Sequence, residues 1–161
     1  MANSAKASKI AIERAGLTPQ DIDLILFATL SPDYYFPGSG VLVQEALQIP
    51  ECPAMDIRMQ CSGFVYALFV ASSLVQNNMS KNILIVCADT YTKYIENSDR
   101  TNKTIFSDGA SAIIIKKNLK KKNTFVFGTD GSGYKNLIVE NSASNFKKNT
   151  QPSIFMDGRK V

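Results

Sequence analysis

Asp21-Ile22-Asp23-Leu24-Ile25-Leu26-Phe27-Ala28-Thr29 is a short and almost continuously apolar run, and it indicates the fold class more clearly than any other segment. A strand of this kind is covered on both faces, as in the interior of a parallel sheet. The run Asn82–Ala88 has the same character and predicts a second interior strand. Shorter runs at 53–57, 110–115 and 124–128 predict further strands. Together these runs predict a sheet whose central strands are buried on both sides.

Helical patterns alternate with the strands. Apolar residues recur at helical spacing over 7–15, and the composition of 41–47 is also helical. Over 62–75 apolar residues fill every face, which predicts a buried helix. Strands that alternate with helices predict an α/β fold with a largely parallel sheet.

Composition excludes several classes of protein. The chain has 161 residues, of which 45% are apolar, enough for the core of one globular domain. It lacks both a long apolar run and a signal peptide, so we expect no membrane span and a cytoplasmic location. A net charge of +4 without a basic, aromatic-interleaved stripe argues against nucleic acid as a partner. The positive run 116–122 predicts either a solvated loop or a surface for an acidic partner.

The cysteines predict neither disulfides nor a metal site. Cys52, Cys61 and Cys87 are too few and too irregularly spaced for a disulfide framework. The chain has no histidine, so the cysteines match no zinc template. We therefore expect free thiols in a reducing cytoplasm.

Cys61 lies in the run Met59-Gln60-Cys61-Ser62-Gly63-Phe64-Val65-Tyr66-Ala67-Leu68, where a short strand is expected to pass into a helix. Free backbone N–H groups at a helix start favour a nucleophilic cysteine and could hold the oxygen of a reacting thioester. Free cysteines are more often simply buried, and position alone favours that interpretation. A nucleophilic cysteine also usually needs an imidazole base. Cys61 is therefore either noncatalytic or part of a larger enzyme.

Several motifs follow one another along most of the chain. They are Ala15–Ile25 with Ala28-Thr29 and Ser31-Pro32-Asp33, then Phe36-Pro37, Cys61-Ser62-Gly63-Phe64, Asp99-Arg100, Phe106–Ala112, Asp130-Gly131-Ser132 and Met156–Val161. In this order they resemble the ketoacyl synthase III branch of the thiolase-fold condensing enzymes.

The resemblance implies a thiolase-like fold in which residues 1–161 form a single, partial N-terminal domain. The opening strand of the family, which would lie between 22–29 and 82–88, and the whole second half with its catalytic His and Asn would be absent. Two interior strand edges would then be left unpaired. We expect the chain alone to be inactive and the parent enzyme to be an acyltransferase.

The resemblance also implies a reaction and its participants. The parent enzyme would start fatty acid synthesis by a decarboxylating Claisen condensation, with acyl-CoA and malonyl-acyl carrier protein as substrates and no tightly bound cofactor. Cys61 would carry the acyl group and Arg100 would contact the coenzyme A nucleotide. Phe106 would line the acyl pocket, and Phe36 would reach the pocket of a partner subunit in a homodimer. Ordinary packing for the two aromatic residues, and a solvated loop charge for Arg100, are the alternatives.

Departures from the family pattern keep other functions open. Ser107 and Ser111 stand where the family usually has glycine, and Gly38 where serine is common. Each serine then needs a hydrogen-bond partner or extra room. The alternatives are a noncatalytic thiolase-fold module that binds a partner subunit or acyl carrier protein, and a related polyketide-type or quinolone-type condensing enzyme.

Overall fold

The computed structural model describes residues 2–117, 124–145 and 147–161. The chain divides into two compact units, the first made of residues 1–89 and 109–125 and the second of residues 90–108 and 126–161. The expectation that residues 1–161 belong to one partial domain stays a prediction. The positive run 116–122 lies largely outside the described residues.

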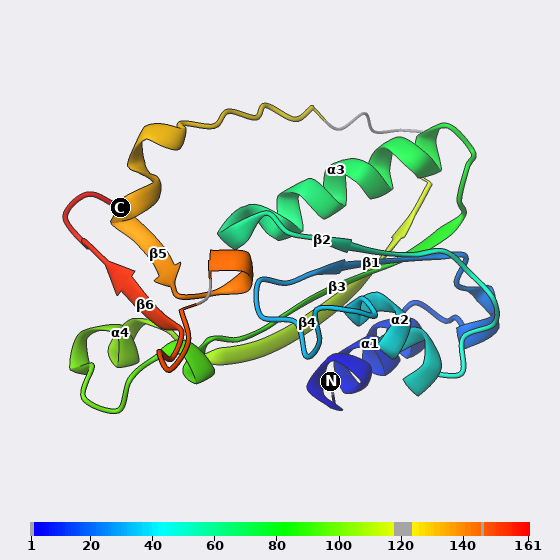
Figure 1. Ribbon diagram of the computed structural model, residues 1–161. Coiled ribbons are helices and arrows are strands. Elements are labelled where there is room, and N and C mark those ends of the chain that lie inside the picture. The colour runs from blue at the N-terminus through cyan, green and yellow to red at the C-terminus, as the bar shows by residue number, and fades with distance from the viewer. Residues whose placement is uncertain (1, 118–123, 146) are drawn as a thin grey trace. The chain divides into compact units, whose positions relative to one another are not determined.

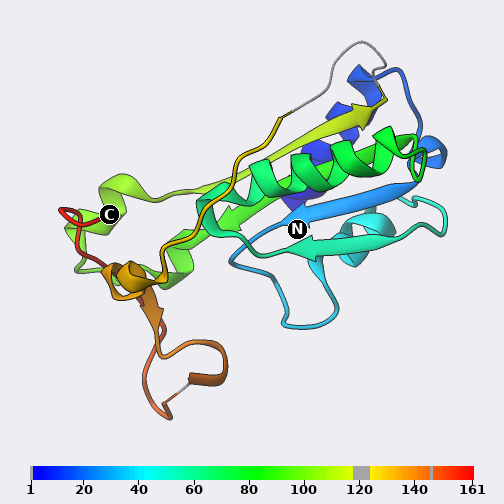
Figure 2. The same cartoon turned by 90° about the horizontal axis from the view of Figure 1, so that it is seen from above.

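The main sheet is four-stranded, in the order β2-β1-β3-β4. Its strands are β1 (Leu24–Ala28), β2 (Ala54–Ile57), β3 (Asn82–Thr90) and β4 (Asp108–Lys116). β1 is parallel to both β2 and β3, whereas β4 runs opposite to β3 (Figure 2). Every residue of β1 is buried. The predicted α/β class, the largely parallel sheet and the interior position of β1 and β3 are confirmed.

Helices cover both faces of this sheet (Figure 1). α1 (Ala2–Arg14) and α2 (Ser39–Ala46) cover one face, and α3 (Gly63–Gln76) covers the other. The side chains of β1 alternate between the two cores, as the pleat requires. Ile25 and Phe27 pack in the core with α1 and α2, and Leu24 and Leu26 pack in the core with α3.

The gap expected between the two interior strands is not present. β1 and β3 pair directly, with Leu26 opposite Ile85 and Ala28 opposite Cys87. Direct pairing is favoured because an unpaired, buried strand edge would leave its N–H and C=O groups without hydrogen-bond partners. The prediction of two unpaired interior edges is therefore wrong for this structure.

α3 is buried along the face that packs on the sheet, but not on every side. Ala67 and Ala71 are fully buried, and their small side chains let the helix lie close to the strands. On its outer side, Phe64, Val65 and Phe69 are exposed to 43%, 45% and 41%. Periodicity predicted burial all round because it counts apolar residues and does not show how many layers of structure surround them.

The second unit contains short elements. They are η3 (Tyr91–Tyr94), α4 (Arg100–Ile105), η4 (Gly131–Asn136), β5 (Leu137–Glu140), η5 (Ala143–Asn145) and β6 (Ser153–Met156). β5 and β6 pair antiparallel, with Leu137 opposite Met156. The strand predicted at 124–128 does not form. Instead, within the first unit, Phe125 meets the ring of Phe69 edge to face with centroids 5.5 Å apart. None of the helices among residues 2–117, 124–145 and 147–161 has the length and hydropathy of a membrane-spanning segment.

Candidate functional site

Cys61 lies in a tight turn between β2 and α3, as the sequence predicts. The turn is the 3-10 helix η2 (Gln60–Ser62), and α3 begins at the next residue. Gln60 has φ +43°, a left-handed conformation that costs energy in a residue with a side chain. The N–H of Ser62 donates to the carbonyl of Met59 at 3.0 Å. Cys61 is exposed and free, whereas Cys52 and Cys87 are half-buried. The interpretation of Cys61 as a buried structural cysteine is therefore wrong.

Gly63 allows the start of α3 to lie against the end of β1. A Cβ added to Gly63 would stand 3.1 Å from the Cβ of Ala28, closer than two carbon atoms normally approach. Gly63 is also buried. The glycine beside Cys61 thus fixes the depth at which the Cys61 turn sits on the sheet.

Asp89, in β3, holds the chain that leaves β1. Its Oδ1 accepts hydrogen bonds from the Leu30 N–H at 2.7 Å, the Ser31 N–H at 3.1 Å, the Ser31 hydroxyl at 2.8 Å and the Thr29 hydroxyl at 3.1 Å. All four donors converge on one carboxylate oxygen. The conformation of residues 29–31 is therefore set by a strand that lies far away in the sequence.

Asp56, in β2, holds the other end of the same connection. Its Oδ2 accepts from the Ser39 N–H at 2.6 Å and its Oδ1 accepts from the Gly40 N–H at 2.8 Å, at the start of α2. A Cβ on Gly38 would stand 3.0 Å from Asp56 Oδ1. Glycine at 38, where the family commonly has serine, therefore lets the chain approach the carboxylate.

Phe36 belongs to the aromatic loop, residues 29–38, which joins β1 to α2. Tyr34, Tyr35 and Phe36 are exposed to 62%, 80% and 88%, and the Phe36–Pro37 peptide is cis. β1 and β2 are parallel neighbours, so the carboxyl ends of both strands lie on the same side of the sheet. The structure thus places the aromatic loop and the Cys61 turn at the carboxyl ends of the strands, the usual position of sites in α/β sheets.

Arg100 and Phe106 lie in the second unit, at the two ends of α4. Arg100 is exposed at the first position of this helix. Phe106 follows the last position and packs on Tyr91, with ring centroids 5.4 Å apart. The Asp99 carboxylate accepts from the Asn102 N–H at 2.9 Å and from the Asn102 amide at 2.6 Å. These bonds hold the pKa of Asp99 below its ordinary value.

Among the residues that the structure describes, the remaining titratable groups show no arrangement suited to a metal. No group of three or more His, Cys, Asp or Glu side chains that could hold a metal ion occurs in the described part of the chain.

The two half-buried cysteines have thiols with raised pKa values. Burial, and secondarily the charge of Asp89, raise the pKa of the Cys87 thiol. Burial, and secondarily Asp23, raise the pKa of the Cys52 thiol. Ser107 and Ser111 are both exposed, so each hydroxyl has the room that it needs.

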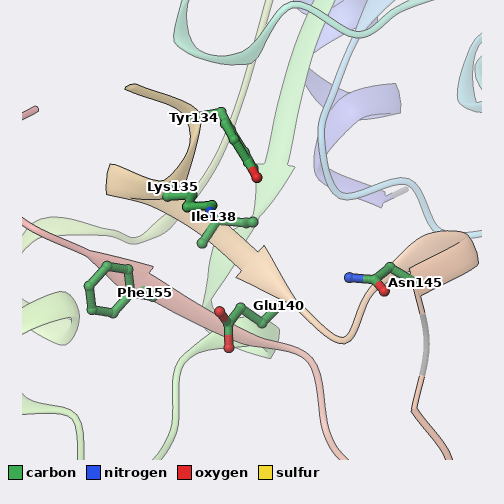
Figure 3. Close-up of a pocket in the computed structure, with 6 residues that line it drawn as sticks. All are labelled: Tyr134, Lys135, Ile138, Glu140, Asn145 and Phe155. Atoms are coloured by element: carbon green, nitrogen blue, oxygen red, sulfur yellow. The ribbon is translucent and has the colours of Figure 1, made fainter. Parts of the chain in front are cut away.

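Sequence patterns did not indicate a pocket of about 460 Å³ in the second unit, beside the β5–β6 pair (Figure 3). None of the predicted site residues lines it. Its lining residues come from β5, β6 and the two short helices that flank β5, and they are Tyr134, Lys135, Ile138, Glu140, Asn145 and Phe155.

Comparisons with known proteins agree with the motif order. Residues 55–131 match the family described as 3-oxoacyl-[acyl-carrier-protein (ACP)] synthase III. The beta-ketoacyl-[acyl-carrier-protein] synthase III of Sulfurovum sp. (strain NBC37-1) is 42% identical over 139 residues, which cover 84% of this chain and 41% of that protein.

Solved structures show the same similarity. A crystal structure of a 3-oxoacyl-(acyl-carrier-protein) synthase III matches with a TM-score of 0.91 at 30% identity, covering 99% of this chain and 53% of that one. The priming beta-ketosynthase of the R1128 polyketide pathway matches with a TM-score of 0.87 at 27% identity, covering 98% and 48%. The expected thiolase-like fold is confirmed, and the chain spans about half the length of the relatives it matches.

Proposed function

Because this chain is a relative of the β-ketoacyl-acyl carrier protein synthase III condensing enzymes, we propose that it supplies the acyl-accepting part of such an enzyme. In this proposal the Cys61 thiolate attacks the carbonyl carbon of acyl-CoA and the coenzyme A thiolate leaves. Malonyl-acyl carrier protein then loses CO₂, and the resulting carbanion attacks the acyl-Cys61 carbonyl. The Cys61 thiolate is released and a 3-oxoacyl-acyl carrier protein starts a fatty acid chain.

The observation that carries the proposal is the position of Cys61. It is the exposed cysteine of the three, and it lies just before Ser62, the N-cap residue of α3, in a turn with a left-handed residue. The N–H groups of Ser62 and Gly63 already donate to the carbonyls of Met59 and Gln60. Other N–H groups in the first turn of a helix have no partner within the helix, and donors of this kind stabilise the oxyanion of a reacting thioester. A turn that presents a nucleophile between a strand and a helix serves the same purpose in other acyl-transfer enzymes.

The proposal assigns only one part of the chemistry to these residues. The 161 residues contain no histidine, and an imidazole usually moves the protons in cysteine-dependent acyl transfer. The proton transfers and the decarboxylation are therefore assigned to groups outside the 161 residues. We expect no turnover of malonyl-acyl carrier protein by these residues alone.

The other site residues and the assembly belong to the same proposal. Arg100, exposed at the start of α4, would contact the coenzyme A nucleotide, and Phe106 would line the acyl pocket. Phe36 is 88% exposed, which supports a role in the pocket of a partner subunit and hence a homodimer. Free cysteines support a cytoplasmic location.

Mass spectrometry after exposure to acyl-CoA tests the assignment of Cys61. We expect a mass increase of one acyl group in the wild type and none in Cys61→Ser. The matched controls Cys52→Ser and Cys87→Ser, which change half-buried thiols, should be labelled like the wild type. Labelling that survives in Cys61→Ser, or a folded wild type that is not labelled, would reject the proposal.

The exposed apolar side of α3, formed by Phe64, Val65 and Phe69, favours a second candidate function. A noncatalytic module would use such a surface to bind another subunit. Copurification with an intact condensing enzyme, combined with no acylation of Cys61, would support it.

The similarity to a polyketide priming ketosynthase favours a third candidate function, that of a polyketide-type condensing enzyme. The preference for one acyl-CoA over another in the labelling experiment would distinguish it from the first.

A further inference from the structure

The aromatic loop is held at both ends by carboxylates from the two strands that flank β1. Asp89 of β3 holds its beginning through the N–H groups of Leu30 and Ser31. Asp56 of β2 holds the other end through the N–H groups of Ser39 and Gly40, which begin α2 directly after the loop. Hydrogen bonds from backbone N–H groups to a carboxylate are charge-assisted and stronger than those between neutral groups.

Asp56 also connects the loop to the Cys61 turn. It stands opposite Phe27 in the pairing of β2 with β1, so its own position in the sheet is fixed. The strand that carries it ends at Ile57 and leads directly into η2 and Cys61. A movement of the loop where it joins α2 at Ser39 is therefore opposed by the strand that places the nucleophile.

We propose that Asp56 and Asp89 form a clamp that fixes the aromatic loop relative to the Cys61 turn, and that Asp56 is thereby a positioning residue for the acyl group. This inference rests on the proposed function, in which Phe36 of the loop completes the acyl pocket of a partner subunit in a homodimer, so that each loop serves the Cys61 of the other copy. A fixed loop keeps that pocket ready for substrate. A loosened loop lowers the population of the binding-competent conformation and raises the acyl-CoA concentration that is needed.

The two carboxylates use their oxygens differently, which provides a matched pair of variants. Each oxygen of Asp56 accepts a hydrogen bond from one backbone N–H. In Asp56→Asn one of these oxygens becomes an NH₂ group, which is itself a donor and cannot accept a hydrogen bond from the N–H that faces it. Asp89 accepts all its donors on Oδ1, so the single oxygen of Asp89→Asn can replace it. We expect Asp56→Asn to loosen the loop and Asp89→Asn to have a much smaller effect.

Hydrogen exchange measures the clamp directly. In Asp56→Asn we expect the amides of Ser39 and Gly40 to exchange about tenfold faster than in the wild type. The change in Asp89→Asn at Leu30 and Ser31 should be below about threefold. Unchanged exchange at Ser39 and Gly40 in Asp56→Asn would overturn the clamp.

Acylation of Cys61 measures the positioning role. In Asp56→Asn the acyl-CoA concentration for half-maximal labelling should rise about 3- to 10-fold, while the maximal labelling rate changes less than about twofold. The control Asp21→Asn changes a carboxylate that accepts from Thr18 before β1, and should leave both values as in the wild type.

Different results would overturn the positioning role of Asp56 and the proposed function. Faster exchange in Asp56→Asn with an unchanged half-maximal concentration overturns the positioning role alone. A fall in the maximal rate without a change in the half-maximal concentration also overturns it, because a general loss of folded protein would have that effect. A wild type that is not labelled overturns the proposed function together with the positioning role.

Discussion

Replacing Gly63 by alanine tests the close contact between the start of α3 and β1. The new Cβ would lie 3.1 Å from the Cβ of Ala28, whereas carbon atoms prefer about 3.5–4.0 Å. Ala28 is 5% exposed and its Cβ is attached directly to the backbone of β1, so no side-chain rotation can move this Cβ away from position 63. Such overpacking costs about 1–3 kcal/mol, and the better helix propensity of alanine returns at most about 1 kcal/mol. We expect a net loss of about 1–2 kcal/mol in the free energy of unfolding.

Urea unfolding of the wild type and the variant measures this loss. The control is Gly109→Ala in β4, because a Cβ added there meets nothing within 4 Å. This variant should leave the free energy of unfolding unchanged or raise it by up to about 1 kcal/mol. Ala28→Gly removes the opposing Cβ, so the Gly63→Ala/Ala28→Gly double variant should show a coupling energy of about 1 kcal/mol. A Gly63→Ala variant as stable as the wild type, without coupling to Ala28→Gly, would show that this contact does not limit the side chain at position 63.

Three further predictions concern the core, the cap of α4 and a half-buried thiol. Leu84 is 0% exposed, so Leu84→Ala should lower the free energy of unfolding by about 2–5 kcal/mol; Val126→Ala, at a residue 91% exposed, should change it by less than about 0.5 kcal/mol in the same denaturation assay. Hydrogen bonds from Asn102 lower the pKa of Asp99 from 3.8. The cap that the Asp99 carboxylate forms on α4 should therefore stabilise the helix fully above pH 3.8, and this stabilisation should be lost as the pH falls through the lower pKa of the folded state. Amide exchange in α4 during an acid titration tests this, and a profile unchanged in Asp99→Asn would contradict it. Because burial and Asp89 raise the pKa of Cys87 from 9.0, its alkylation by iodoacetamide near pH 9 should be slower in the folded than in the urea-unfolded protein; equal rates would count against it.

Features that depend on a short stretch of chain could be predicted from the sequence. The almost continuous apolar runs of β1 and β3 predicted interior strands, because only a strand covered on both faces needs no polar side. The motif around Cys61 predicted a cysteine between a strand and a helix for a similarly local reason. The order of the motifs also predicted the fold to which the comparisons point.

Short elements with weak patterns were beyond this kind of prediction. α4 has six residues, and β5 and β6 have four each, so none is long enough to show a clear hydrophobic period. The apolar run at 124–128 predicted a strand that does not form. A strand forms only where another edge is available to pair with it, and the composition of the run does not show that edge.

The α/β class, the two interior strands, the place of Cys61 in the chain and the family it resembles follow from the amino-acid sequence alone. Three features depend on how the chain folds in space: β1 pairs directly with β3, one side of α3 is exposed, and Asp56 and Asp89 hold the aromatic loop. The two groups of features differ in the range of the interactions behind them. Side-chain periodicity acts within a few residues, whereas the bond from Thr29 to Asp89 joins residues 60 positions apart, and such a bond exists only once the strands have been brought side by side.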